Sequence, residues 1–146
     1  MSVSSEFAVK LQAAGLSLNF NGVGAINCFV GILPDSPDQC VAIFERPGQA
    51  PILTMTGQSQ AESLLDQPAV QIRVRTAPAD YVAGNTLMQG VYKVFQGFVE
   101  SALNVGGLYF HLITALGSPL YLGQDVRQRH EWSQTFRTIY DDTQRQ

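Results

Sequence analysis

The sequence predicts an α+β domain in which a mainly antiparallel or mixed β-sheet carries two helices, one of them long, on one face. Two segments repeat apolar residues at helical spacing, and several short segments are apolar or alternate as strands do. They follow in the order helix, strand, strand, loop, strand, long helix, strand, loop, strand. The 146 residues suit one domain over 1–146. A chain of this size can bury a core without disulfides or metals.

The N-terminal segment, from Ser4 or Ser5 to Gly15, is expected to be a helix that ends at the glycine. Its apolar residues recur three or four positions apart: Phe7, Ala8, Leu11 and Ala14. Residues 16–27 contain Asn21-Gly22 and a further glycine, so they are predicted to be mostly loop.

Two apolar runs, Cys28–Leu33 and Cys40–Glu45, are predicted to pair as a hairpin around a proline-containing loop. In a hairpin the two thiols would lie about 17 Å apart along the ladder. A disulfide requires Cα atoms within about 7 Å. Both cysteines are therefore expected to be buried free thiols, and two cysteines are too few for a zinc site.

Residues 46–67 contain two prolines and two glycines and are predicted to form a long connection, with a short helix near Ala61–Leu65. The next segment, Ala69–Arg75, alternates strictly between apolar and polar residues. This pattern predicts a strand with one covered face.

The second helix is expected from Ala79 to Asn104, where one apolar stripe persists at helical spacing. Gly90 and Gly97 share a face of this helix and are expected to let it approach the sheet closely. Two strands follow, at Leu108–Leu116 and His130–Tyr140. The stripe consists of Leu87, Met88, Val91, Phe95, Phe98, Val99 and Ala102.

The face of the sheet away from the helices is expected to be polar and rich in arginine. Arg73, Arg75 and Arg137 fall on strands, whereas Arg127 and Arg129 lie in the loop before the last strand. A solvated surface would explain all five arginines. They could instead form salt bridges between subunits or line a passage for a polyanion.

Composition excludes several classes of function. The net charge is −3, which disfavours binding to nucleic acid or to anionic membranes over the whole surface. Charged residues make up 14% of the chain, against about 25% in a typical globular domain. A polar surface with few charges suits a protein that packs against neighbouring subunits. No run is long and apolar enough to span a bilayer.

No catalytic or cofactor site is expected. Gly22–Asn27 lacks the third glycine of a dinucleotide-binding loop and precedes a strand. His111 is expected to be a structural residue of a strand. His130 and Glu131 are adjacent in a strand and point to opposite faces, so they cannot pair as a base and its orienting carboxylate.

One succession of segments resembles the minor capsid, or tail terminator, proteins of long-tailed bacteriophages. It runs from Gly31–Gly48 through Val70–Arg75 and Ser118–Asp125 to Arg129–Ser133. The resemblance covers nearly the whole chain, and Gln71–Arg75 and the Pro-Leu-Tyr-Leu-Gly-Gln-Asp segment are its most specific parts. The chain departs from the family in the glycine content of its long helix, where a more charged helix is expected.

The resemblance implies a non-enzymatic structural protein of the virion, located at the head–tail junction and assembled in the host cytoplasm. Such proteins form a ring, expected to be hexameric, that caps the head-proximal end of the tail tube, stops its growth and joins the head connector. The implied partners are further copies of the chain, the tail tube protein, the connector or completion protein, and genomic DNA as a passing polyanion. No membrane and no cofactor is implied.

Two loops with apolar and arginine anchors are predicted to make the contacts in this ring, because such side chains concentrate interface energy. An adaptor protein of the neck is the alternative close in role. A small-molecule-binding or catalytic α+β domain is the distant one. The predicted contact residues are Ile52, Leu53, Met55, Tyr121, Leu122, Arg127 and Arg129; the predicted lumen or salt-bridge residues are Arg73, Arg75 and Arg137.

Overall fold

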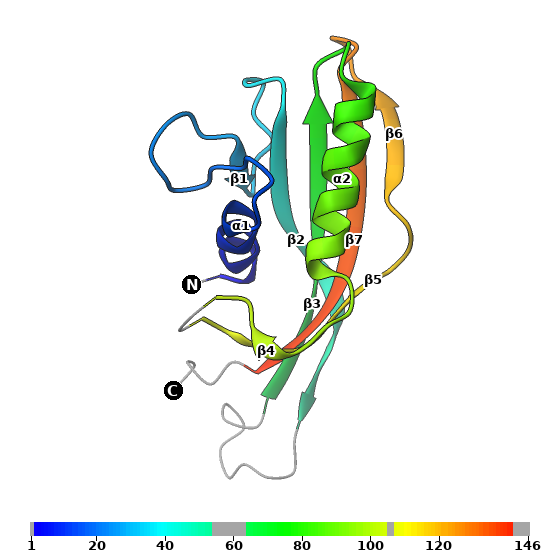
Figure 1. The fold of residues 1–146 in the computed structure, drawn as a ribbon. Helices are drawn as coiled ribbons and strands as arrows, with labels where there is room; N and C mark the ends of the chain where they lie inside the picture. Colours follow the sequence, from blue (N-terminus) through cyan, green and yellow to red (C-terminus); the bar gives the residue numbers. More distant parts are fainter. Residues whose placement is uncertain (1, 54–63, 105–106, 142–146) are drawn as a thin grey trace.

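The computed structural model describes residues 2–53, 64–104 and 107–141 (Figure 1). Two helices and seven strands follow one another along the chain. In order they are α1 (Val3–Ala13), β1 (Cys28–Val30), β2 (Cys40–Leu53), β3 (Leu64–Thr76), α2 (Tyr81–Phe95), β4 (Phe98–Ala102), β5 (Tyr109–Ala115), β6 (Leu120–Gln124) and β7 (His130–Asp141).

The seven strands form one mixed sheet with the order β1-β2-β3-β7-β5-β4. β1 is parallel to β2, and every other pair is antiparallel. β7 carries two strands on one side: β6 pairs with its first residues and β5 with its last. Both helices lie on the same face of the sheet (Figure 1), so the predicted α+β class is confirmed.

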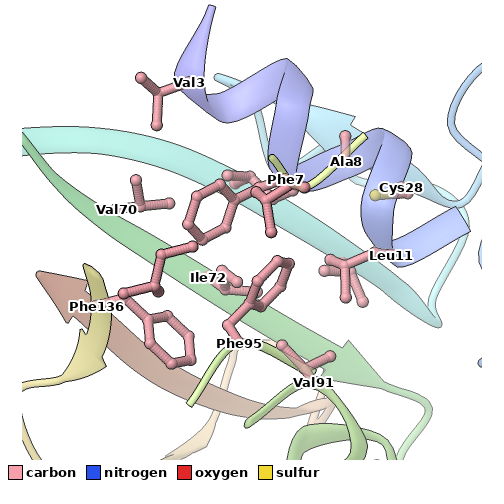
Figure 2. Close-up of a cluster of buried hydrophobic side chains, with 14 of the residues drawn as sticks. Val3, Phe7, Ala8, Leu11, Cys28, Val70, Ile72, Val91, Phe95 and Phe136 are labelled. Atoms are coloured by element: carbon pink, nitrogen blue, oxygen red, sulfur yellow. The ribbon is translucent and has the colours of Figure 1, made fainter. Parts of the chain in front are cut away.

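The core lies between the two helices and the covered face of the sheet. Phe7 of α1 stacks on Phe95 of α2 with ring centroids 4.4 Å apart, and Phe136 of β7 packs against both rings (Figure 2). The apolar positions of the alternating strand β3 are fully buried beneath them, as the alternation predicts. Each large side chain buried in this way stabilises the fold by roughly 1.5–3 kcal/mol.

Helix α1 forms where the sequence predicts it. Ser2 is the N-cap, and its side chain accepts a hydrogen bond from the Ser5 N–H at 3.2 Å. Gly15 has a φ of +77°, a left-handed conformation that glycine adopts without strain, and it ends the helical run. The predicted loop over 16–27 is also confirmed; within it, the Asn19 side chain accepts from the Gly22 N–H at 2.7 Å.

The predicted hairpin of β1 and β2 is wrong. The two strands are parallel, and Cys28 lies opposite Val41, which makes Cys40 a diagonal neighbour of Cys28. The thiols are therefore much closer than the hairpin implied, but Cys28 points into the core and Cys40 to the other face. Both are buried free thiols, as predicted. Burial, with a contribution from Cys40, raises the pKa of Cys28 to about 12.

The prediction of one long helix over residues 79–104 is also wrong for the second half of that range. α2 ends at Phe95, Gly97 has a φ of +77°, and the chain continues as strand β4. The close approach of helix to sheet occurs at Gly84, where an added Cβ would lie 2.4 Å from the Trp132 ring. Gly90 faces Leu16 instead.

The predicted connection over 46–67 is largely strand. Residues 46–53 continue β2 and residues 64–67 belong to β3, and the two strands pair out to Leu53 and Leu64 with two register shifts. This part of the β2–β3 pair extends beyond the helices (Figure 1). The predicted short helix falls partly on residues 61–63, outside the described residues, and its end at Leu65 is strand.

Candidate functional site

The described residues give no sign of a metal centre or a membrane span. They hold no group of three or more histidine, cysteine, aspartate or glutamate residues placed to bind a metal ion. No helix among them is long and apolar enough to cross a membrane. Three surfaces carry the predicted contact and arginine residues: the two ends of the sheet and its uncovered face.

One end of the molecule is formed by residues 34–38 and 124–130, which we call the turn end. Arg75, at the end of β3, is 3% exposed and holds the first of these segments. Its guanidinium donates to the backbone carbonyls of Pro34, Pro37 and Asp38, the last two at 2.7 and 3.1 Å. A charged side chain thus satisfies the carbonyls of an irregular segment that has no strand partner.

Arg129 joins the two segments of the turn end. It is 5% exposed, and its Nε donates to Asp125 at 2.8 Å. Its Nη1 donates to the Asp35 carbonyl at 2.7 Å and lies 3.4 Å from the Asp38 carboxylate. The neighbouring Arg127 is 60% exposed and pairs with the Asp35 carboxylate at 2.8 Å.

The pKa of Asp125 reflects this arrangement. Burial alone would raise the pKa of its carboxyl, but hydrogen bonds from the backbone and guanidinium of Arg129 and from the Arg127 N–H outweigh burial. The pKa is therefore held below its ordinary value of 3.8. The turn end is a fixed ion-pair network at neutral pH.

Four aromatic rings lie beside this network. Tyr81 and Tyr121 are both partly exposed and meet edge to face at 5.3 Å, and Trp132 lies beneath them. His130 Nε2 donates to the Pro78 carbonyl at 2.9 Å, because a carbonyl can only accept. In the neutral ring, His130 Nδ1 then accepts from the Tyr121 hydroxyl at 2.7 Å. The tyrosines are held in place before any partner arrives.

The opposite end consists of the paired strands beyond Glu45 and Pro68, which we call the hairpin arm. Residues 45–50 are exposed there. Side-chain contacts join the arm to itself and to the sheet: Arg46 donates to Gln71 at 2.9 and 2.7 Å, Gln67 donates to the Ala50 carbonyl at 2.7 Å, and the Tyr140 hydroxyl donates to Asp66 at 3.3 Å. The backbone pairing of β2 with β3 continues along the arm to Leu53 and Leu64.

The face of the sheet away from the helices is polar, as predicted. Arg73 reaches Glu131 at 3.4 Å, Arg137 donates to Gln67 at 3.1 Å, and Gln71 donates to Ser133 at 2.9 Å. The Nε atoms of Arg73 and Arg137 are buried and have no hydrogen-bond partner among the described residues. Arg75 was predicted to lie on this open polar face, but the 34–38 segment covers it.

Comparison with known proteins gives one decisive match. The sequence profile described as "Bacteriophage tail terminator protein" matches residues 11–142. The chain belongs to the bacteriophage tail terminator family. The match covers most of the chain, including every strand and α2. The resemblance seen in the sequence is thereby confirmed, and the protein belongs to a family of phage structural proteins.

The fold of this tail terminator family member also occurs in a solved virion. A chain in the structure titled "Virion of native gene transfer agent (GTA) particle" superposes with a TM-score of 0.64 at 15% identity. The superposition covers 96% of this chain and 95% of that chain. A search of curated proteins returned no significant match.

The structure separates the predicted contact residues of this family member into two groups. Ile52 and Leu53 belong to β2 in the hairpin arm, and Met55 lies outside the described residues. The other four do not all lie in a loop, contrary to the prediction: Tyr121 and Leu122 belong to strand β6, beside the turn end, and Arg127 and Arg129 belong to the turn end itself. Whether these residues make contacts between subunits stays a prediction.

Sequence reasoning missed the role of Tyr81 and His130 in placing Tyr121. Tyr81 begins α2 and His130 begins β7, so the two come from elements far apart in the sequence. A local signal for Tyr81 existed, because an exposed aromatic residue at the start of a helix is available for contacts. Nothing local to His130 predicts the bond from Tyr121.

Proposed function

We propose that this chain forms a ring, expected to be hexameric, that caps the head-proximal end of the phage tail tube and stops its growth. The ring then joins the tail to the head connector. Tail terminator family membership supports the first part of this proposal. The match to a chain of a gene transfer agent virion agrees with a role in a particle of this kind.

The observation that carries the proposal is the chemical difference between the two ends of one long sheet. A tube grows because each layer presents a surface that accepts the next. Termination requires a subunit that matches this surface on one side and presents a different surface on the other. The hairpin arm is a pair of strands in which residues 45–50 are exposed, whereas the turn end is a set of ion pairs beside aromatic rings.

A phage that lacks this protein tests the proposal. We expect tails of uncontrolled length that do not join heads, and restoration of both properties when the wild-type chain is supplied. Electron microscopy of the lysate measures both. Tails of normal length beside unfinished heads would favour the adaptor role, and tails of normal length joined to heads would exclude both roles.

We propose that the predicted contact residues divide between the two sides of the ring. Ile52 and Leu53 would act at the hairpin arm, and Tyr121 and Leu122 of β6 would act with Arg127 of the adjoining turn end. Met55, which lies outside the described residues, stays a predicted contact residue. Arg129 is buried, so we expect it to act by holding the turn end in shape. Tyr121→Ala should reduce binding to tails, whereas Val23→Ala, at a fully exposed valine, should not.

We propose that Arg73 and Arg137, on the uncovered face, meet acidic groups in the assembled particle. These groups would be carboxylates of the next subunit or phosphates of DNA in the lumen. Assembly in rising salt separates the two cases. Arg137→Gln should weaken ring formation if the partner is a subunit, and should slow DNA release from intact particles if the partner is DNA.

No catalytic step belongs to this proposal. His130, which could serve as a base, is hydrogen-bonded to the Pro78 carbonyl and to the Tyr121 hydroxyl. Its neighbour Glu131 pairs with Arg73 on the other face, as strand alternation predicts. A hydrolase or transferase activity that copurifies with the protein and is lost in His130→Ala would contradict the proposal.

A further inference from the structure

Strand β6 has one open edge. Among the described residues it pairs with β7 alone, so its other edge has no strand partner. The backbone N–H and C=O groups along such an edge can pair with another chain. Native proteins usually protect an edge of this kind with charges, with proline inside the strand, or with a covering segment.

The sequence of β6 lacks the first two of these protections. Its five residues, Leu-Tyr-Leu-Gly-Gln, include no charge and no proline. Leu120 is 60% exposed, Tyr121 39% and Leu122 44%. The strand is short and has a register shift between Tyr121 and Gly123, so a partner could pair over only a few residues. These properties suit a specific contact and limit open-ended aggregation.

The other sheet edges in the described part of the chain carry protections of these kinds. At β1, the Cys28 N–H already donates to the Asn19 carbonyl at 3.1 Å. The outer edge of β2 beyond its pairing with β1 carries Glu45, Arg46 and two prolines. At β4, an acidic residue, Glu100, stands in the middle of the strand sequence. β6 is therefore the edge among those described that has neither a charge nor a proline, and none of the other edges is suited to pair with it in a second copy.

The side chains of β6 are also held in place by contacts within the chain itself. Leu120 pairs with Ser133 and points to the uncovered face of the sheet, whereas Tyr121 pairs with Trp132 and points to the helix side. The Tyr121 ring lies 5.3 Å from the Trp132 ring, and its hydroxyl is bonded to His130 at 2.7 Å. A partner strand would meet an edge that loses little freedom on binding.

We propose that the open edge of β6 accepts an extended, uncharged segment of another virion protein, which adds to the sheet as an eighth strand. Strand addition of this kind obtains affinity from backbone hydrogen bonds and specificity from the flanking side chains. We expect the added segment to be uncharged, because its side chains would lie next to Leu120 on one face of the sheet and next to Tyr121 on the other. A charge placed there would lose water without gaining a partner. This inference rests on the proposed function, because it requires assembly with other subunits.

Hydrogen exchange on the full-length protein tests the backbone part of the inference. The probe is tails purified from a phage that lacks this protein. On binding to these tails, the amides of residues 120–124 should exchange at least about tenfold more slowly, while residues 20–26 should be unchanged. The isolated protein at high concentration should show no such slowing. Slowing in the isolated protein would overturn the inference, because it would mean that β6 pairs with a second copy.

Charge substitution tests the edge independently. Leu120→Lys combined with Leu122→Lys should reduce binding to the tails at least about tenfold, because lysine on an edge blocks strand addition. Val23→Lys, at a fully exposed position outside the turn end, is the matched control and should bind as the wild type does. Thermal unfolding should show that all variants are folded.

The outcomes separate the two proposals. If the wild-type protein binds tails but β6 stays unprotected, or if the double lysine variant binds as Val23→Lys does, the inference is wrong and the tail terminator role stands. If the wild-type protein binds no tails, the proposed function fails and the inference fails with it.

Discussion

The turn end and the hairpin arm both lie beyond the core, and different forces hold them. At the turn end, two buried arginines satisfy the carbonyls and carboxylates of two irregular segments. In the hairpin arm, backbone pairing joins two strands whose residues 45–50 are exposed. Irregular backbone needs side-chain partners to hold one shape, whereas paired strands supply their own. We therefore expect the turn end to respond to charge and pH, and the arm to respond to backbone geometry.

The core beneath both ends should show the largest effect. Phe95→Ala removes a fully buried ring that stacks on Phe7 and should lower the free energy of unfolding by roughly 3–5 kcal/mol. Denaturant unfolding measures this loss. Val82→Ala, on the same helix but 77% exposed, should change stability by less than about 0.5 kcal/mol. Equal effects would mean that α2 is not anchored through Phe95.

The next largest effect should come from the arginine pair of the turn end. Arg129→Met leaves Asp125 without its guanidinium partner and separates the 34–38 segment from the 124–130 segment. We expect a lower Tm and faster amide exchange in both segments, with the arm unchanged. Arg127→Met, at a 60% exposed ion pair, should leave the Tm nearly unchanged. If the two variants behave alike, burial does not distinguish these arginines.

Acid should loosen the turn end before the arm. The pKa of Asp125 is lower in the folded protein than its ordinary value of 3.8, so its carboxylate stabilises the fold fully above that value. This contribution is lost as the pH falls through the lowered pKa. Amide exchange in residues 124–130 should therefore rise on acidification below about pH 4, and Asp125→Asn should remove that dependence. A matching rise in residues 45–50 would contradict the difference between the two ends.

The arm should give the smallest effect on global stability and a clear local one. A Cβ at Gly48 would lie 1.8 Å from the Gln67 carbonyl oxygen, so Gly48→Ala must separate the two strands there. Because the arm lies outside the core, we expect a global change below about 1 kcal/mol. Amide exchange in residues 49–53 should increase strongly, and Gln49→Ala should have no such effect. A large fall in Tm would show that the arm supports the core.

The elements that alternation and local spacing define were predictable from the sequence. Helix α1 and the buried positions of β3 follow directly from periodicity. The second helix was predicted to be too long, because its apolar residues continue at helical spacing into β4, where Phe98 is half-buried. Gly97 was the available signal, since its left-handed conformation ends the helical run.

The parallel pairing of β1 and β2 could not be predicted from these two segments alone. Two apolar runs separated by a short proline-containing loop favour a hairpin on local grounds. The chain crosses back instead, and Arg75, 37 positions from Asp38, holds the crossing loop. The burial of Arg129 has the same cause, because its partners Asp35 and Asp38 are more than 90 positions away. Contacts at such separation leave no periodic pattern in the sequence.

β7 runs without a break through the length of the sheet. Its 12 residues span about 40 Å at ~3.3 Å per residue, from the turn end to the strand pairs near the base of the arm. β6 is attached near its first residue and β5 at its last. A load applied at one end of the molecule would pass to the other along a single covalent chain, with no loop in between to absorb it. β7 therefore connects the turn end to the base of the arm directly.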